Sequence, residues 1–285
     1  MFNNISFIGA GKVGCNLAKY FMEKGYNING FFCNSLNSKQ FIEETLNLKT
    51  FSSLHLLVKS SDAIFITTPD DEIKNIWNIL KETKDLNNKF LVHVSGSLNS
   101  DVFTDINKFG AYGFSVHPMW PFSDKHTSYK GLKEAYFSIE GNIEKIHTVE
   151  KFINSLGNNS FIISKEHKTL YHAANVAVSN LVLSLINLGT EYLSLCGIDE
   201  NNAKDALMPL ILNNINSIKE KGFIDSLTGP IERLDLGTIE HHLSVIPQEH
   251  IDIYKGLSLN LVKLSKEKNP NKNYKELEKI LQEEC

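Results

Sequence analysis

The stretch 5-ISFIGAGKVGCNLAKYF-21 decides the fold of the first part of the chain. A short apolar segment, typical of a buried strand, leads directly into Gly9, Gly11 and Gly14, and an amphipathic helix follows. In such a GxGxxG motif the first glycine permits a tight turn and the second lets the backbone approach a pyrophosphate. The third allows helix and strand to pack closely, and the helix start attracts the anion. We therefore expect dinucleotide contacts at Gly9, Ala10, Gly11, Lys12, Val13 and Gly14.

The end of the second expected strand distinguishes between dinucleotides. An NAD enzyme usually carries an acidic residue there, hydrogen-bonded to the ribose 2′-hydroxyl. This chain instead reads 31-FFCNSLNSKQ-40, and its next carboxylate is Glu43. Asn34 and Ser35 can hydrogen-bond a 2′-phosphate, and Lys39 offers charge, although Asn and Ser also suit a plain loop. The segment favours NADP over NAD.

Apolar strands alternate with helical segments up to about residue 163, and from residue 165 only helical periodicity remains. This pattern predicts an α/β fold, with a doubly wound parallel sheet at residues 1–164 and an all-α domain at residues 165–285. The first domain is expected to be an NADP-binding Rossmann domain. The expected strands are 5–8, 28–33, 63–67, 90–94, 111–117, 136–140 and 161–163. The expected helices are 12–24, 38–46, 71–82, 101–107, 143–155, 167–195, 200–221, 248–267 and 274–283.

Three segments are expected at the ligand-binding edge of the sheet, because ligands in an open parallel sheet lie beyond the carboxyl ends of the strands. His117, after the fifth strand, either contacts substrate or is a structural histidine before a rigid proline turn. Asp70 is interpreted as the cap of the next helix. The residues at this edge that we expect to contact the cofactor are Thr67, Thr68, Pro69, Ser95 and Gly96.

A polar stripe interrupts the apolar helix that begins at 166-EHKTLYHAANVAVSN-180. At about 100° per residue, Lys168, His172, Asn175 and Ser179 fall within roughly 60° of one another. The helix is expected to be buried, and an unpaired buried polar group costs about 1–3 kcal/mol. The stripe therefore needs a partner, which is either a ligand or a network of other side chains.

Reduction of a carbonyl by NADPH requires a proton donor and a group that holds the developing alkoxide. We predict that Lys168 or His172 donates the proton, and that Asn175 and Asn180 orient the substrate. Downstream, 226-SLTGPIERLDLGT-238 is expected to be an irregular polar loop. Arg233 in it either clamps a substrate carboxylate or pairs with Asp235. Further substrate contacts are expected at Thr228 and Ser179.

Composition excludes several functional classes. The chain has 285 residues, 42% hydrophobic and 22% charged, with a net charge of -4 and no basic block, so no nucleic-acid partner is expected. Four scattered cysteines, without CxxC, and an adjacent His241–His242 pair predict reduced thiols and no metal site. A strand begins near the N-terminus without a targeting signal, and the apolar helix is interpreted as a core helix. A cytoplasmic protein with no membrane partner is expected.

Six ordered motifs are spread along the chain from residue 9 to residue 243: GAGKVG, TTPDDEI, HVSGS, SVHPMWPF, YHAANVAVSN and LTGPIERLDLGTIEHHL. Together they resemble the Rossmann-like NADP oxidoreductases with a conserved helical C-terminal domain, which include the PanG-type ketopantoate reductases. The resemblance implies an active site between the domains and a homodimer formed through the helices. It also implies reduction of a small 2-oxo acid, 2-dehydropantoate to pantoate, in pantothenate synthesis. Val176 departs from the lysine and asparagine spacing of related ketopantoate reductases, so Lys168 and His172 remain alternative proton donors.

Two rival functions remain open at this point. One is an NADPH-dependent imine reductase similar to pyrroline-5-carboxylate reductase. The other is a non-catalytic NADP-binding sensor, which would bind NADPH without turnover and would not need the polar stripe.

Overall fold

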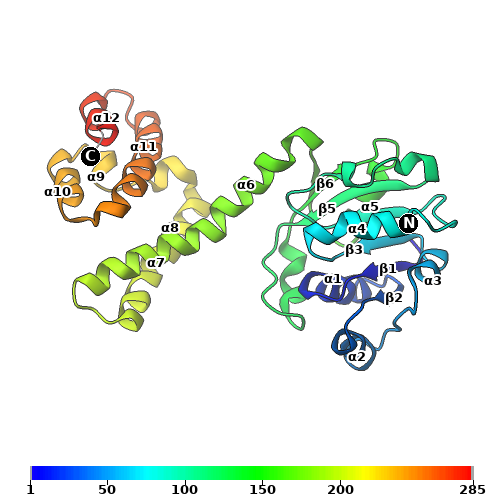
Figure 1. Cartoon of the computed structure of the whole chain (residues 1–285). Helices are drawn as coiled ribbons and strands as arrows, with labels where there is room; N and C mark the ends of the chain where they lie inside the picture. The colour runs from blue at the N-terminus through cyan, green and yellow to red at the C-terminus, as the bar shows by residue number, and fades with distance from the viewer. Residues whose placement is uncertain (1, 284–285) are drawn as a thin grey trace. The chain divides into compact units, whose positions relative to one another are not determined.

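The structure, a computed structural model, describes residues 2–283. The chain forms two compact units, one ending at Val182 and the other beginning at Leu183 (Figure 1). The helix that carries the polar stripe, α6 (Lys168–Val178), therefore belongs to the first unit. The sequence pattern placed the boundary earlier, at residue 164, because the pattern registers where strands stop and not where packing stops.

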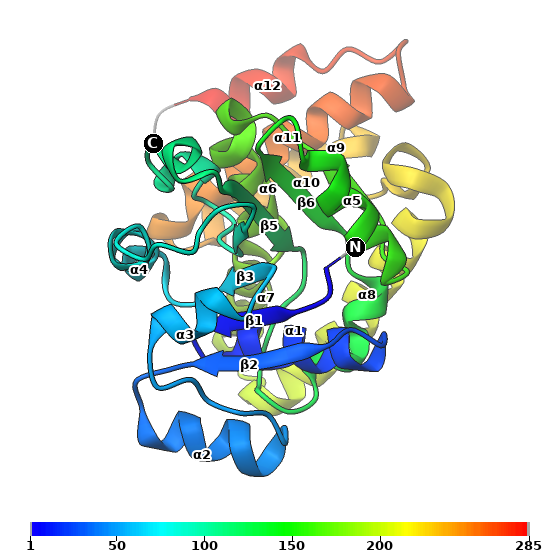
Figure 2. The same ribbon diagram turned by 90° about the vertical axis from the view of Figure 1, so that its right-hand side faces the viewer.

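The first unit is built on one seven-stranded sheet with the order β2-β1-β3-β4-β5-β6-β7 (Figure 2). The first five strands are parallel, as expected, but β6 runs antiparallel to β5. The sheet is therefore mixed at this edge. A parallel neighbour requires a crossover, usually helical, and the β5–β6 connection contains only a 3₁₀ segment. The strands are β1 (Ile5–Ile8), β2 (Ile28–Phe32), β3 (Ala63–Ile66), β4 (Phe90–His93), β5 (Tyr112–Pro118), β6 (Phe137–Gly141) and β7 (Ser160–Ile162).

Helices cover both faces of the sheet, and β3 shows why. Its side chains point alternately to opposite faces: Ala63 and Phe65 join one apolar cluster, while Ile64 and Ile66 join the other. The first cluster includes α1 (Lys12–Glu23), α2 (Leu36–Thr45) and α5 (Ile146–Ser155), and the second includes α3 (Leu54–Lys59) and α4 (Asp70–Leu80).

The 3₁₀ segments of the whole described chain are η1 (Ser100–Val102), η2 (Ile106–Phe109), η3 (Ser128–Glu134), η4 (Lys165–His167) and η5 (Gln248–His250).

The expectation of one buried helix at 167–195 is wrong in two respects. The helix is divided into α6 and α7 (Asn180–Leu195) at Ser179, and only Lys168 and Thr190 along them are buried. The run Lys165–Leu195 is long and apolar enough to cross a membrane. One helix that meets these two criteria is weak evidence for a membrane span. Periodicity identifies apolar faces but does not say which surface covers them, and most of this run is exposed in the single chain.

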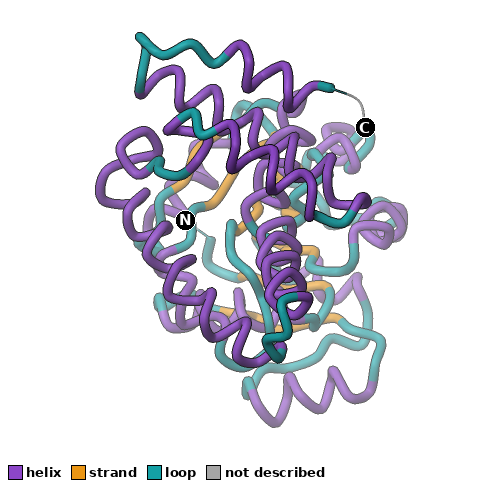
Figure 3. Tube along the Cα trace, turned by 90° about the vertical axis from the view of Figure 1, so that its left-hand side faces the viewer, coloured by secondary structure: helices purple, strands orange, loops and turns teal. Residues whose placement is uncertain are grey.

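The described part of the second unit consists of helices and connecting loops without a strand; Figure 3 colours helices purple, strands orange and loops teal. The irregular loop expected near residue 230 instead forms two short helices, because Pro230 begins one and Asp235 caps the next. A small core of Ile231, Ile239, Val262, Tyr274, Leu277 and Leu281 holds this unit together. Its helices are α8 (Glu200–Ser226), which Gly222 interrupts, α9 (Pro230–Arg233), α10 (Leu236–Val245), α11 (Ile251–Lys268) and α12 (Lys275–Gln282).

Candidate active site

The three glycines of the first motif differ in what requires them. Gly9 has a φ of +100°, and a Cβ there would lie 3.0 Å from the backbone of Thr67. A Cβ on Gly14 would overlap the Thr67 hydroxyl and the Gly9 carbonyl. Gly11 has a φ of −77°, and its Cβ would approach only the Thr67 carbonyl oxygen, at an ordinary 3.8 Å. The protein itself therefore requires Gly9 and Gly14, whereas the missing side chain at Gly11 leaves room for a ligand.

A cleft of about 300 Å³ opens over this motif at the carboxyl ends of β1, β2 and β3. Lys12, Val13 and Gly14 lie in the first turn of α1 and are not among its lining residues. The lining residues that the sequence analysis missed include Ser38 on α2 and Lys125 in the β5–β6 connection, whereas Lys39 does not line the cleft. From the predicted cofactor set the cleft brings together Gly9, Ala10, Gly11, Asn34, Ser35, Thr67, Thr68 and Pro69.

The charge of this cleft matches the sequence argument for NADP. No acidic side chain is among the described residues that line it, and Lys125 supplies a cation. A carboxylate at the end of β2 would repel a 2′-phosphate, so the lining is compatible with that group. The first backbone N–H groups of α1 are free to bind an anion, because the N-cap residue Gly11 has no side chain to accept their hydrogen bonds. The first turn also holds no acidic residue that would repel the anion.

A second group of predicted residues meets beyond the ends of β4 and β5. A Cβ on Gly96 would lie 2.5 Å from His172 Nδ1 and 3.0 Å from His117 Nε2, so both imidazoles touch this glycine. On the other side of its ring, His117 Nδ1 lies 2.7 Å from the hydroxyl of Tyr171 on α6. Burial, reinforced by the charge of Lys168, lowers the pKa of His117 to about 3. His117 is therefore neutral near neutral pH.

Lys168 is the most unusual member of this group. Its side chain is 1% exposed, and within residues 2–283 its Nζ has no hydrogen-bond partner. The ammonium lies 5.2 Å from the centre of the Tyr171 ring. Burial lowers the pKa of Lys168 to about 8, against the opposing charges of Glu140 and Asp70. His172 Nδ1 is also buried without a partner in the described part of the chain. Two polar atoms from the predicted stripe are therefore unsatisfied at one place.

Asp70 holds the loop on which Gly96 lies. One of its carboxylate oxygens, Oδ2, accepts hydrogen bonds from Ser95 Oγ at 2.6 Å and Ser97 Oγ at 2.9 Å. The interpretation of Asp70 as a helix cap is wrong, since Pro69 occupies the N-cap position of α4. Asp70 instead lies in the first turn of α4, and its hydrogen bonds connect this helix to the loop after β4.

His93 is a buried residue that the sequence analysis missed. Its Nε2 lies 3.1 Å from the carbonyl oxygen of Asn99, and the backbone N–H of Ser95 points to its Nδ1 at 3.3 Å. Burial lowers the pKa of His93 to about 4. Because both ring nitrogens are occupied, we assign His93 a supporting role beneath the loop.

The rest of the stripe makes local contacts. Asn175 Nδ2 donates to the Tyr171 carbonyl at 2.8 Å, one turn back on the same helix. Ser179 Oγ donates to the Asn175 carbonyl at 2.7 Å and to Asn180 Oδ1 at 3.0 Å, and both Ser179 and Asn180 are exposed. These contacts do not bring Ser179 and Asn180 to the group around Gly96. The substrate roles of Asn175, Ser179 and Asn180 remain predictions.

Thr228 and Arg233 belong to the second unit and are exposed there. Asp235, the alternative partner of Arg233, caps α10 and accepts hydrogen bonds from the backbone N–H and the hydroxyl of Thr238. The hydrogen bonds from Thr238 are the main cause of the lowered pKa of Asp235, and the charge of Arg233 is a smaller cause. The assignment of Thr228 and Arg233 to substrate binding therefore stays a prediction.

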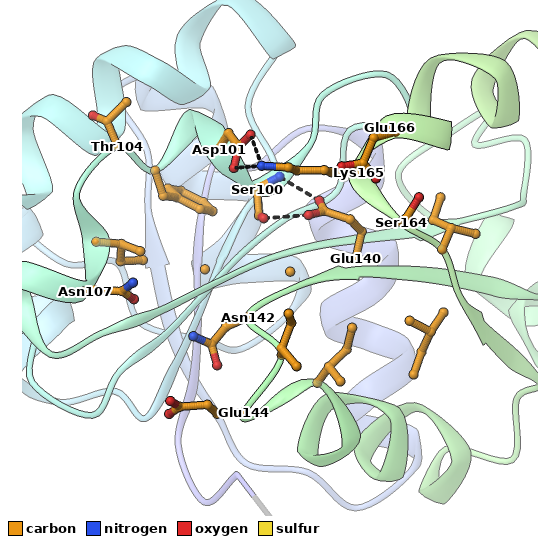
Figure 4. A pocket seen from close by; sticks show the side chains of 18 of the residues that line it. Ser100, Asp101, Thr104, Asn107, Glu140, Asn142, Glu144, Ser164, Lys165 and Glu166 are labelled. Carbon is orange, nitrogen blue, oxygen red and sulfur yellow. Dashed lines mark hydrogen bonds and ion pairs between the residues drawn. The ribbon is translucent and has the colours of Figure 1, made fainter.

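A larger cleft, of about 880 Å³, lies on another side of the first unit (Figure 4). Glu140 in it accepts hydrogen bonds from the Ser100 backbone and hydroxyl, each at 2.7 Å, and Lys165 pairs with Asp101 at 3.1 Å. Glu140, Lys165 and Asp101 therefore all have partners within the protein. None of the predicted site residues lines this cleft. Its size alone does not make it the better candidate, and the unsatisfied groups lie beside Gly96.

Two family models match the chain, and their ranges differ from the two packing units. Residues 3–118 match the model of the Rossmann-like domain. The first unit contains a Rossmann-like domain. Residues 135–261 match a domain of unknown function, DUF2520, and this match includes α6 with Lys168 and His172. The Rossmann-like domain thus supplies the glycine cleft, and the DUF2520 segment supplies the unsatisfied lysine. No curated protein is significantly similar to the chain.

Similar solved structures span nearly the whole chain. A protein of Thermotoga maritima is 26% identical with a TM-score of 0.71, covering 93% of this chain and 98% of that one. A Bacteroides fragilis protein, provisionally named an NADP oxidoreductase, is 21% identical with a TM-score of 0.70, covering 92% and 98%. Plasmodium falciparum pyrroline carboxylate reductase, solved with NADP bound, is 17% identical with a TM-score of 0.60, covering 93% and 96%. The last two likenesses show a shared fold.

Proposed function

We propose that this protein is an NADPH-dependent oxidoreductase that reduces the carbonyl of a small 2-oxo acid, with 2-dehydropantoate as the substrate and pantoate as the product. The observation that carries the proposal is the buried, unpartnered ammonium of Lys168, together with the unpartnered Nδ1 of His172 one turn further along α6. Leaving a charged group buried without a partner is costly. Such groups are expected where a ligand completes their hydrogen bonds.

The cofactor assignment is supported by the cleft over Gly11. The space above this glycine, the open start of α1 and the lack of acidic lining residues in the described chain all fit a phosphorylated dinucleotide. The similar reductase from Plasmodium falciparum holds NADP. When bound, NADPH supplies a hydride to the substrate carbon.

Lys168 would then supply the proton that completes the reduction. As hydride reaches the carbonyl carbon, the electron pair of the C=O bond moves to oxygen, and that oxygen takes a proton from Nζ. Solvent afterwards returns a proton to the neutral amine. A pKa of about 8 suits this task, because the group is protonated near neutral pH yet is a stronger acid than an ordinary lysine. His172, whose Nδ1 also lacks a partner in the described chain, would hydrogen-bond the same substrate.

The choice between a carbonyl and an imine substrate also depends on Lys168. An iminium ion already carries its proton and its positive charge, so it needs no donor and would be repelled by a buried ammonium. A carbonyl needs both the proton and the positive charge as its oxygen becomes anionic. Both 2-oxo acids and pyrroline-5-carboxylate carry a carboxylate, so that group does not distinguish them. Lys168 thus favours the oxo acid over the imine.

The experiment is to follow NADPH absorbance with purified protein and a panel of substrates. 2-Dehydropantoate and other 2-oxo acids should support NADPH consumption, and pyrroline-5-carboxylate should not. In parallel, the gene should allow a strain that lacks ketopantoate reductase to grow in medium without pantothenate. Turnover of the cyclic imine alone would favour the imine reductase. Tight NADPH binding without turnover of any substrate would favour the sensor.

We also propose that the chain acts as a homodimer through its helical unit. Along α8, Met208, Leu212 and Ile215 recur at helical spacing within roughly 60° of one another and are exposed. Leu183 and Leu185 add exposed apolar surface on α7. Apolar faces of this extent on a water-soluble unit are usually covered in an assembly, and self-association is the commonest way to cover them.

A further inference from the structure

Lys125 is a cation in the candidate dinucleotide cleft that comes from a distant part of the chain. It lies in the β5–β6 connection, yet it lines the same cleft as Asn34, Ser35 and Ser38, which follow β2. Its Nζ lies 5.6 Å from the centre of the Phe41 ring on α2. Across residues 2–283 this ammonium makes no hydrogen bond or ion pair, so it is available to a ligand.

The turn that carries Lys125 is fixed against the glycine-motif helix. Asn16 on α1 is fully buried, and its Nδ2 donates to the Asp124 carbonyl at 2.6 Å while its Oδ1 accepts from the Tyr129 N–H at 2.8 Å. Within the turn, the Asp124 carboxylate accepts the backbone N–H groups of His126 at 2.5 Å and Thr127 at 2.6 Å. The position of Lys125 beside the cleft is therefore determined by buried and local hydrogen bonds.

We propose that Lys125 is the residue that selects NADP over NAD, by pairing with the 2′-phosphate of the bound cofactor. Asn34, Ser35 and Ser38 complete the phosphate contacts from the opposite side of the cleft. This inference rests on the proposed NADP cofactor but not on the proposed substrate. It also replaces Lys39 as the source of positive charge, since Lys39 follows β2 in sequence but does not line the cleft.

Charge explains why one lysine suffices for the selection. A 2′-phosphate is close to a dianion near neutral pH, and hydrogen bonds between charged partners are roughly twice as strong as neutral ones. NAD carries a hydroxyl at the same place and gains little from an ammonium. Because the turn that carries Lys125 is held before the ligand arrives, little backbone freedom is lost on binding.

The test is calorimetric binding to the full chain, without any substrate. The ligands are NADP⁺ and NAD⁺, together with the fragments 2′,5′-ADP and 5′-AMP, which differ only in the phosphate. Lys125→Met keeps the aliphatic stem over Phe41 and removes the charge, whereas Lys125→Arg keeps the charge. Lys39→Met is the matched control, because it removes a nearby lysine outside the cleft.

Lys125→Met should weaken NADP⁺ and 2′,5′-ADP by about 10-fold or more and leave NAD⁺ and 5′-AMP nearly unchanged. Lys125→Arg should retain the preference, and Lys39→Met should behave as wild type. Unchanged NADP⁺ affinity in a Lys125→Met variant that melts like wild type overturns the inference, as does a wild type without preference for NADP⁺. Wild-type protein that binds neither dinucleotide overturns the proposed cofactor as well. Selective binding without turnover overturns only the proposed reductase.

Discussion

His117 Nδ1 and the hydroxyl of Tyr171 lie 2.7 Å apart and join strand β5 to helix α6. This contact places the next residue of the helix, His172, against Gly96 and in the same group as the buried Lys168. The carboxyl edge of the sheet and the first turns of α6 therefore form one polar site within the first unit. The predictions below test separate parts of this arrangement.

Lys168→Met should make the protein more stable and inactive. The folded-state pKa of about 8 lies below the ordinary 10.5, so between these values the unfolded chain binds more protons and stability rises with pH. The cost of burying the charge is complete below about pH 8, and it disappears above about pH 10.5. Near neutral pH, Lys168→Met should raise the free energy of unfolding by roughly 3 kcal/mol. Denaturant unfolding of the first unit near pH 7 and again near pH 10 measures the difference, which should shrink at the higher pH.

The rate of reduction should fall as pH rises through about 8. Lys168 can donate a proton only while it is protonated, so kcat should decrease by about tenfold for each pH unit above its pKa. His117, with its pKa of about 3, stays neutral over this range and should add no further step near pH 6. A profile of kcat against pH at saturating NADPH is the measurement. A profile that shows no decline above about pH 8 would exclude Lys168 as the proton donor.

Gly96→Ala should reduce turnover without preventing cofactor binding. The added Cβ would lie 2.5 Å from His172 Nδ1, so the imidazole must move. We expect kcat to fall by about 10-fold or more, since misplacement by a fraction of an ångström is enough for such a loss. The control is Gly256→Ala on α11, where a Cβ meets nothing within 4 Å. Equal activity of the two variants would remove His172 from the site.

Gly11→Ala should impair dinucleotide binding, whereas Gly14→Ala should impair the stability of the protein. Gly11→Ala meets only an ordinary contact in the protein, so it should keep its melting temperature and lose dinucleotide affinity. Gly14→Ala overlaps Thr67 and should lose about 1–3 kcal/mol of stability. Thermal melting with and without NADP⁺ separates these effects. A Gly11→Ala protein that NADP⁺ still stabilises normally would show that the pyrophosphate lies elsewhere.

Ile215→Glu should convert the proposed homodimer to a monomer. A glutamate placed in an apolar interface leaves a buried charge without a partner. Ile79→Glu on α4 is the matched control, because both isoleucines are 53% exposed in the single chain. Sedimentation of the two variants should give a monomer for the first and a dimer for the second. A wild type that sediments as a monomer would refute the proposed dimer directly.

Much of the first unit could be predicted from the sequence, because its signals are local. The glycine motif, the alternation of strands and helices and the stripe of Lys168 and His172 each depend on neighbouring residues. The antiparallel direction of β6 was missed, although the expected elements include no helix between residues 117 and 136 and a parallel neighbour needs a crossover. The role of Asp70 was also ambiguous, since a carboxylate at a helix start can cap the helix or bind a neighbouring loop.

Lys125 was missed because it is distant along the chain from the other residues of the cleft. Lys125 reaches the cleft only because Asn16 holds its turn, and nothing in the sequence around Lys125 signals that bond. The exposure of α6 and α7 was missed because an apolar helix has the same pattern whether it is covered by its own chain or by another. The short helices α9 and α10 were read as a loop, since caps and loops use the same residues.

The buried amide of Asn16 has a consequence for the mobility of the first unit. It joins the turn at 124–129 to the helix of the glycine motif, and the side chain uses both its donor and its acceptor to do so. Although the turn is largely solvent-accessible, its backbone should exchange amide hydrogens slowly, at a rate close to that of α1. The two segments should therefore open together, as a single cooperative piece of the molecule.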